Sequence, residues 1–206
     1  GGASPPCRGR PPPLPAPLCS RTRESELLAH IYARSADLRA RFPQVVVGPG
    51  HDCAAVAAPG GPAMLLKVDQ IVSGRHYRPF PETPLDLIAR KAVARAVSDI
   101  AAAGGSPLAA MAAAALPADC AHANELFDAM SRWAVHFGCP LVGGDIAALP
   151  TGQIAAVLSV SVVGSPHPVR GPVLRSGARP GDGIYVTGRL GGSLEKSTGL
   201  GRHLTF

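Results

Sequence analysis

Four aspartates are the residues of this sequence best suited to chemistry, because each is expected near the end of a regular element. Asp52 follows a short apolar run and a Gly-Pro-Gly turn, and Asp69 closes a second apolar run. Asp99 lies near the end of a helical pattern, and Asp145 follows Leu-Val-Gly-Gly. Rigid scaffolds present functional groups at such ends. Carboxylates converging from separate elements suit Mg²⁺, which proteins hold through carboxylates together with substrate phosphates.

Asp99 is the most informative of the four. Ala92, Ala96 and Ala103 share its side of the predicted helix. A carboxylate on such a small apolar face needs a cation or several hydrogen-bond donors. Each aspartate also has a purely local explanation as a turn or capping residue, and separations of 17, 30 and 46 residues form no motif. The residues alone therefore leave both interpretations open.

Other residues are candidates for binding anions. His76, in Gly-Arg-His-Tyr, either pairs with a phosphate or is an ordinary loop histidine. Arg175 and Arg179 are anion-binding candidates or solvated charges. Lys196 follows a glutamate, so the GxxxxGK[ST] phosphate loop is absent, and no GxGxxG follows a predicted strand. Nucleotide chemistry in this chain would need another device.

The elements that must position these residues alternate between helices and strands. A first helix is predicted over 22–42, with these side chains inward: Leu27, Leu28, Ile31, Leu38 and Phe42. A second is predicted over 84–103, where a capping box at Thr83 begins the helix and Gly104 ends it. A third is predicted over 120–137, with these side chains inward: Leu126, Phe127, Met130, Ala134 and Phe137. Strands are predicted over 45–47, 64–69, 111–116, 141–142, 154–163 and 183–187. The alanine content of 111–116 leaves a helix possible there.

Composition excludes several classes of protein. The 206 residues include 24 Gly and 22 Pro, which rules out a coiled coil, and no apolar run is long enough to span a membrane. Four arginines, at positions 8, 10, 21 and 23, account for most of the net charge of +6, so the remainder lacks the basic stripe of a nucleic-acid binder. Five cysteines without a CxxC pair are expected to be reduced thiols. We expect a soluble cytoplasmic protein.

Three segments follow from these patterns. Residues 1–21 are proline-rich and expected to be disordered, 22–165 form an amino-terminal domain, and 166–206 form a linker and the start of a second domain. The fold class is α+β, a mixed sheet packed with helices, followed by a truncated second α/β domain.

Five segments, in order, resemble the thiamine-monophosphate kinase family: GPGHDCAAV, LLKVDQIVSGRHY, ARKAVARAVSDIAAAGGSPLA, LVGGD and LRSGARPGDGIYVTGRLGG. That family belongs to the superfamily of aminoimidazole ribonucleotide synthetase and selenophosphate synthetase. The resemblance implies an amino-terminal domain whose sheet builds a homodimer. It also implies that ATP is held between domains through Mg²⁺.

The resemblance assigns roles to individual positions. It implies metal binding by Asp52, Asp69, Asp99 and Asp145, contact between His76 and the acceptor phosphate, and ATP binding by Gly144, Asp145 and Arg175. The implied reaction is ATP-dependent phosphorylation of thiamine phosphate to thiamine diphosphate. No residue is assigned as catalytic, because the acceptor phosphate is itself the nucleophile and such transfer depends on positioning and charge.

The sequence also departs from the family pattern. His51 stands where the family has the first carboxylate of Gly-Asp-Asp, and Lys67-Val68 replaces small hydroxyl residues. Family members continue into a domain with further motifs, so we expect the function to be incomplete in this chain. Two alternatives stay open: a ring-closing ATP-dependent ligase of the aminoimidazole ribonucleotide synthetase type, and a non-catalytic dimerising fragment.

Overall fold

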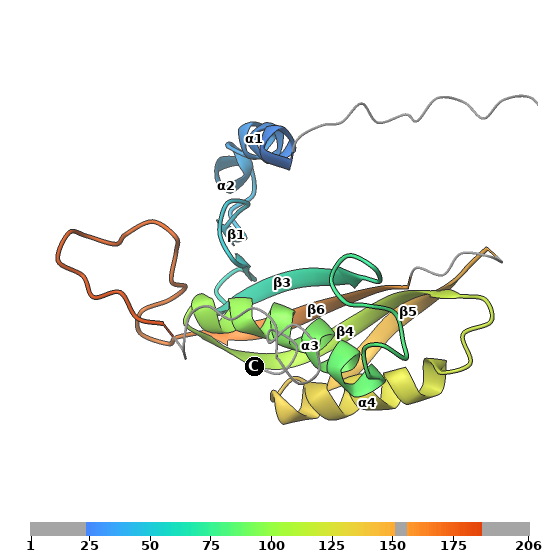
Figure 1. Ribbon diagram of the computed structural model, residues 1–206. Coiled ribbons are helices and arrows are strands. Elements are labelled where there is room, and N and C mark those ends of the chain that lie inside the picture. The colour runs from blue at the N-terminus through green and yellow to red at the C-terminus, as the bar shows by residue number, and fades with distance from the viewer. Residues whose placement is uncertain (1–23, 151–155, 187–206) are drawn as a thin grey trace, which may run out of the picture.

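The computed structural model describes residues 24–150 and 156–186, and within them a six-stranded sheet with helices on one side (Figure 1). The strands lie in the order β1-β2-β3-β6-β4-β5. Only β4 and β5 pair in parallel, and the other neighbours are antiparallel. The strands are β1 (Val45–Val47), β2 (Ala54–Ala57), β3 (Ala63–Val72), β4 (Gly105–Pro117), β5 (Leu141–Leu149) and β6 (Val157–Pro166).

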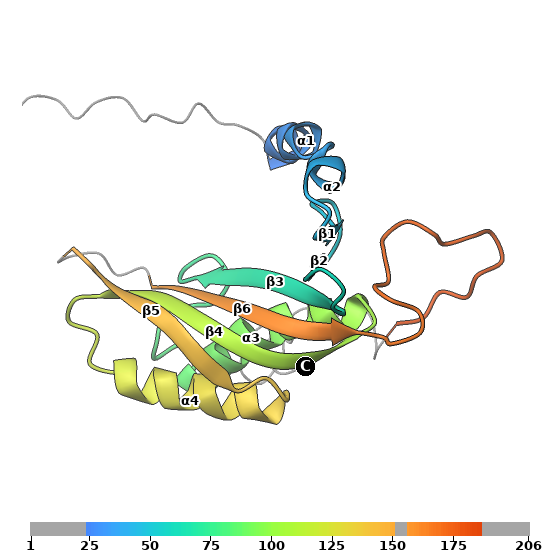
Figure 2. The ribbon, with the colours of Figure 1, turned by 180° about the vertical axis from the view of Figure 1, so that it is seen from behind.

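Two helices cover one face of this sheet. They are α3 (Leu85–Ala102) and α4 (Ala123–His136), and α4 also makes the crossover that the parallel β4–β5 pair requires. Seen from behind, the other face of the sheet carries no described helix (Figure 2). The predicted mixed sheet packed with helices is therefore confirmed.

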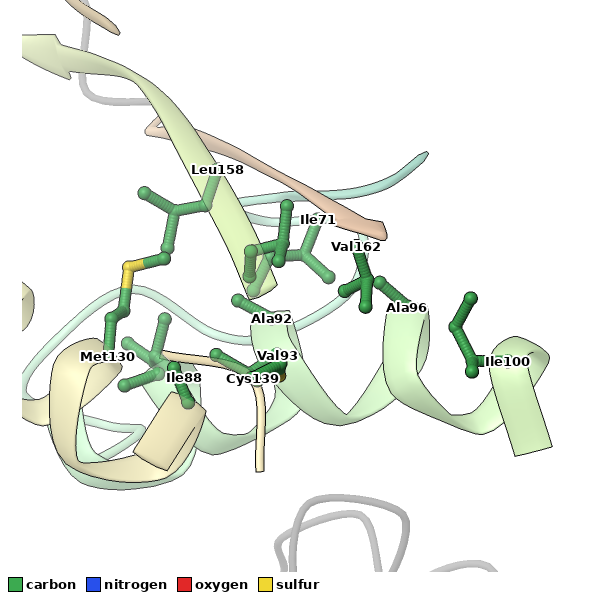
Figure 3. Close-up of a cluster of buried hydrophobic side chains, with 14 of the residues drawn as sticks. Ile71, Ile88, Ala92, Val93, Ala96, Ile100, Met130, Cys139, Leu158 and Val162 are labelled. Carbon is green, nitrogen blue, oxygen red and sulfur yellow. The ribbon is translucent and has the colours of Figure 1, made fainter. Parts of the chain in front are cut away.

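The core fills the space between the sheet and α3. Along β6, Leu158, Val160 and Val162 are buried while the serines between them are half-buried, as the predicted alternation requires. Figure 3 shows Leu158 and Val162 beside Ile71 of β3, facing Ile88 and other side chains of α3. This apolar layer holds α3 at a fixed place on the sheet.

The carboxyl end of α3 is pressed close against the strands. Gly104, directly after the helix, has a φ of +68°, which glycine adopts without strain and which ends the helix as predicted. At Gly164 of β6, an added Cβ would lie 2.8 Å from the Ser106 carbonyl oxygen and 2.9 Å from Ile100 Cγ2. Small residues are needed here because the helix end and the sheet are in contact.

The start of α3 differs from the prediction. Pro84 is the N-cap rather than the first helical residue, and no side chain caps the helix. The Thr83 hydroxyl is buried without a hydrogen-bond partner among the described residues, so the predicted capping box does not form. The Pro84 carbonyl instead accepts bonds from the amides of Leu87 and Ile88.

Three strands are longer than predicted. β4 runs from Gly105 to Pro117, beyond both ends of the predicted 111–116. β3 continues to Val72, so Asp69 lies inside the strand rather than at its end. β5 runs through the predicted Gly-Gly-Asp turn, because Gly144 and Asp145 pair in register with Ala112 and Ala113 of β4. β2, a run of alanines and one valine, was not predicted, since it shows no alternation.

The amino-terminal helix is the largest error. In place of one helix over 22–42 there are α1 (Glu24–Arg34) and α2 (Leu38–Arg41), separated by a turn, and Thr22 lies outside the described residues. Both helices stand away from the sheet (Figures 1 and 2). Of the side chains predicted to point inward, Leu38 is half-buried and lines a small cavity with Val46 and Val47 of β1. The other four are exposed: Leu27, Leu28, Ile31 and Phe42.

In α4, Leu126, Met130 and Ala134 are buried as predicted, but Phe127 is exposed, because its neighbour Leu126 already points inward.

Residues 183–186, predicted as the start of a strand, form no strand. Thr187 and the predicted disordered segment 1–21 lie outside the described residues. The described helices include none with the length and apolar character needed to cross a bilayer.

Candidate functional site

Lys67 and Asp69 of β3 point to the side of the sheet that carries α3. They pair across the sheet with Val162 and Val160, whose side chains are buried beneath the helices. Paired residues on neighbouring strands project from the same face. The strand therefore places two charged side chains in a layer that is otherwise apolar.

α3 supplies their partners. Lys67 Nζ forms an ion pair with Asp99 Oδ2 and lies 3.9 Å from Asp69 Oδ2. Arg95, one helical turn before Asp99, brings its guanidinium 3.4 Å from Asp69 Oδ1. The side chains of Lys67, Asp69 and Asp99 are 19, 22 and 26% exposed, so water screens these pairs less than it screens surface pairs.

Asp52 joins from the turn between β1 and β2. The Arg175 guanidinium donates to Asp52 Oδ1 from Nε at 3.0 Å and from Nη2 at 2.6 Å. These bonds hold the pKa of Asp52 below its usual value, and the charge of Lys67 acts in the same direction. The Arg175 amide donates to His51 Nδ1 over 3.3 Å, so the segment after β6 is fixed to this turn.

The neighbouring Cys53 connects the turn to α3. Its thiol donates to the Asp99 carbonyl oxygen at 3.2 Å, and burial raises the pKa of Cys53 to about 11. The turn, β3 and the end of α3 thus meet in one place. We call the six charged residues that meet there the ionic cluster: Asp52, Lys67, Asp69, Arg95, Asp99 and Arg175.

The ionic cluster is electrically balanced without any added ion. Three carboxylates face one lysine and two arginines, and each carboxylate has a cationic partner. In the described ranges, no three His, Cys, Asp or Glu side chains come together as a metal site requires. The side chains as they lie therefore do not fit a bound Mg²⁺, although three of the four predicted carboxylates do converge.

Asp145 lies elsewhere. It is exposed on β5, with β6 and β4 between it and Asp69. Gly144 and Asp145 line a cavity of about 640 Å³ between β4, β5 and α4, whose other walls are mainly apolar. At Gly144 an added Cβ would overlap the Ala112 carbonyl oxygen, so only glycine fits there.

His76 is held rigidly beyond the end of β3. The Val72 amide donates to His76 Nδ1 over 3.0 Å, and Lys91 Nζ donates to the His76 carbonyl oxygen. Burial lowers the pKa of His76, and the nearby Arg95 and Lys91 charges lower it further. A neutral imidazole that accepts at Nδ1 carries its proton on Nε2.

The sequence analysis missed Lys91 and Arg95. Lys91 is buried among the apolar residues of α3, and burial lowers its pKa to about 8. The sequence feature that could have identified Lys91 is its position on the same helix face as the apolar residues Ile88 and Ala92. For Arg95 the signal was its position four residues before Asp99. The backbone amide of Arg179, the other arginine considered for anion binding, donates to Asp182 Oδ2 at 2.7 Å, a contact that leaves the role of its side chain untested.

Comparison with known proteins identifies the fold. The family described as AIR synthase related protein, N-terminal domain, matches residues 50–165, which is more than half of the chain. The chain belongs to this family. That match includes Asp52, the whole of β3, and the part of α3 that carries Asp99.

Proteins named thiamine-monophosphate kinase are similar to the chain in sequence. The protein from Rhodopirellula baltica is 36% identical over 190 residues, covering 88% of this chain and 55% of the relative. The protein from Mycobacterium tuberculosis is 37% identical over 151 residues, covering 72% and 43%. The chain thus spans about half the length of the curated relatives it matches, and the predicted resemblance is confirmed.

Solved structures show the same architecture. AaThiL complexed with AMPPCP and TMP matches with a TM-score of 0.57 and 26% identity over 78% of this chain and 48% of that one. The thiamine monophosphate kinase from Aquifex aeolicus gives a TM-score of 0.55 and 25% identity, covering 77% and 48%.

Proposed function

We propose that this chain serves the ATP-dependent phosphorylation of thiamine phosphate to thiamine diphosphate. The observation that carries the proposal is 36% identity over 190 residues to a thiamine-monophosphate kinase. A structural relative of the same fold binds AMPPCP and TMP, which supports the same pair of ligand classes. The activity would belong to the whole kinase, of whose length this chain represents about half.

In this reaction an oxygen of the thiamine phosphate attacks the γ-phosphorus of ATP. The bond between that phosphorus and the β–γ bridging oxygen breaks, and ADP leaves with the electron pair. The acceptor oxygen is already anionic, so no general base is needed, and the protein positions the groups and neutralises charge. Residues with fixed donors and cations are what such a site requires.

His76 is proposed to contact the acceptor phosphate. Its Nδ1 is occupied by the Val72 amide, which leaves the Nε2 proton to be donated to a phosphate oxygen. Lys91 holds the backbone of the same residue through its carbonyl oxygen. The imidazole is therefore oriented before the substrate arrives.

Arg175, Gly144 and Asp145 are proposed to bind ATP. The Arg175 side chain is 60% exposed, so the guanidinium can turn from Asp52 to a phosphate at little desolvation cost. Gly144 offers backbone without a side chain beside the cavity that Asp145 also lines.

Metal ligation by Asp52, Asp69, Asp99 and Asp145 stays a prediction. The ionic cluster as it lies does not fit the ion, because each of its carboxylates already has a cationic partner. Magnesium is commonly held by nucleotide phosphates together with one or two carboxylates, and it neutralises charge on those phosphates. Mg²⁺ is therefore proposed to arrive with ATP.

Homodimerisation through the sheet is also part of the proposal. On the face without helices, Val68 and Met111 both pair with Ser161 of β6, and they are 61% and 48% exposed. Large apolar side chains in one row on an uncovered sheet are typical of a surface that meets another protein. A second copy would bury this row.

The test is a chimera in which this chain replaces the matching part of the Rhodopirellula baltica relative. We expect thiamine diphosphate to form from thiamine phosphate and ATP, measured by chromatography. His76→Ala should raise KM for thiamine phosphate more than KM for ATP, whereas Arg179→Gln should leave both unchanged. A folded chimera without turnover, beside an active relative, would contradict the proposal.

A further inference from the structure

The Lys67 ammonium lies between the carboxylates of Asp69 and Asp99, where one cation can interact with both. Its ammonium forms an ion pair with Asp99 Oδ2 and lies 3.9 Å from Asp69 Oδ2. The two carboxylates come from different elements, β3 and α3, so the lysine connects strand to helix. Its side chain is 19% exposed, which places this charge beneath the helix rather than in the solvent.

The charge balance around the two carboxylates is already complete. Arg95 provides a second positive charge, 3.4 Å from Asp69 Oδ1. Two carboxylates thus face two cations of the chain. A divalent ion entering between them would meet a surplus of positive charge, and it would have to displace the ammonium from Asp99.

The geometry makes the same point. Mg²⁺ requires oxygen ligands at about 2.0–2.1 Å in near-octahedral arrangement. The Lys67 ammonium is in direct contact with the Asp99 oxygen that such an ion would use. Metal and lysine therefore compete for one position.

We propose that the Lys67 ammonium is a built-in cation that takes the place of a metal ion between Asp69 and Asp99. It binds β3 to the carboxyl end of α3 at all times, whereas a metal ion would do so only when bound. The chain without nucleotide thus keeps this part of the ionic cluster ordered in the absence of divalent metal. This inference does not depend on the proposed reaction.

The test compares the full chain with Lys67→Met, which replaces the ammonium-bearing chain by an unbranched apolar one that is one atom shorter. Binding of Mn²⁺ alone is measured by electron paramagnetic resonance and calorimetry, without ATP. We expect Lys67→Met to bind Mn²⁺ at least about tenfold more tightly than the unmodified chain. Asp99→Asn added to Lys67→Met should abolish the gained site.

Thermal unfolding gives an independent measurement. Ligands that bind only the folded state raise its midpoint. The unmodified chain should respond to Mg²⁺ no more than to NaCl of equal ionic strength, whereas Lys67→Met should have a lower midpoint that Mg²⁺ restores. Lys67→Arg, the matched control that keeps the charge, should stay insensitive to Mg²⁺.

Two results would overturn the proposal. The first is an Mn²⁺ site in the unmodified chain that disappears in Asp99→Asn, and this result decides the matter even if Lys67→Met does not fold. The second is a folded Lys67→Met, verified by circular dichroism, that binds Mn²⁺ no better than the unmodified chain. Loss of kinase activity in the chimera would leave both measurements unaffected, so failure of the proposed function and failure of this inference are distinguishable.

Discussion

A strand in a sheet covered on one side usually has apolar residues on the covered face and polar residues on the open face, and β3 partly reverses this pattern. On the side covered by α3, two charged residues, Lys67 and Asp69, lie between the buried Leu65 and Ile71. On the open side Val68 is 61% exposed and Met64 43% exposed. Charge is beneath the helix and apolar surface is in the open.

The difference indicates what each face is for. Charges are kept beneath a helix only when they are paired, because an unpaired buried charge is costly. Exposed apolar residues in a row suit contact with another protein. The covered face thus contributes buried apolar residues to the core and charged residues to the ionic cluster. The open face is suited to contact with another protein.

The largest expected effect comes from the apolar part of the covered face. Ile71→Ala removes a fully buried side chain, and such changes lower the free energy of unfolding by about 2–5 kcal/mol. Val68 lies three residues earlier, on the open face of the same strand. Val68→Ala should therefore change the free energy of unfolding by less than about 0.5 kcal/mol in the monomer. Urea unfolding of both variants measures the difference, and equal losses would mean that the faces are wrongly assigned.

A charge on the open face should weaken the self-association that we propose for this face. Val68→Lys places like charges against one another in a dimer built on this face, and we expect the dissociation constant to rise at least tenfold, which is about 1.4 kcal/mol. Leu27→Lys, on α1 and comparably exposed at 51%, is the control. Analytical ultracentrifugation measures both. An unchanged dissociation constant for Val68→Lys would remove this face as the interface.

Breaking the pair beneath the helix should have a smaller effect. Asp99→Asn leaves Lys67 with Asp69 as its remaining partner, and a half-buried pair of this kind is worth about 1 kcal/mol. The loss should shrink at high salt. Glu82→Gln, which breaks the exposed pair between Arg78 and Glu82, should change the unfolding free energy by less than about 0.5 kcal/mol. A more stable Asp99→Asn would mean that repulsion between carboxylates dominates the cluster.

The smallest effect concerns the exposed edge of the ionic cluster. Arg175 lowers the pKa of Asp52 from its ordinary value of 3.8, so the pair stabilises the folded chain fully above about pH 4 and loses its contribution as pH falls through the lowered pKa. Arg175→Gln should raise the pKa of Asp52, observed by carboxyl NMR titration. Stability of the two proteins should differ at neutral pH and converge in acid. Arg179→Gln should leave the titration unchanged.

Sequence patterns predicted much of the layered core. The alternation of β6 and the apolar face of α4 were visible because burial imposes a period on the residues. The full length of β5 and the exposure of α1 were not predicted, for opposite reasons. β5 is continued by pairing with β4, a contact distant in sequence, whereas α1 has a helical period but no described surface to cover.

The site was predicted only in part. Asp52, Asp69 and Asp99 were expected together, and they do meet. The pairing of Lys67 and Arg95 with these aspartates was not predicted. These pairs form only because β3 packs against α3, and no local sequence pattern shows that contact. The separation of Asp145 was equally invisible, since it follows from the order of strands in the sheet.

The central place of β6 has a consequence for synthesis. The edge of β3 that does not pair with β2 must wait for residues encoded 85 (Val72 to Val157) to 99 (Leu65 to Gly164) positions later, and contacts of such separation slow folding. At about 5–20 residues per second, that wait lasts for seconds on the ribosome. Throughout it, Lys67 and Asp69 interrupt an apolar strand with charge, and charge of this kind discourages an unpaired edge from joining another chain. We therefore expect the two charges that later pair with side chains of α3 to reduce aggregation of the nascent strand as well.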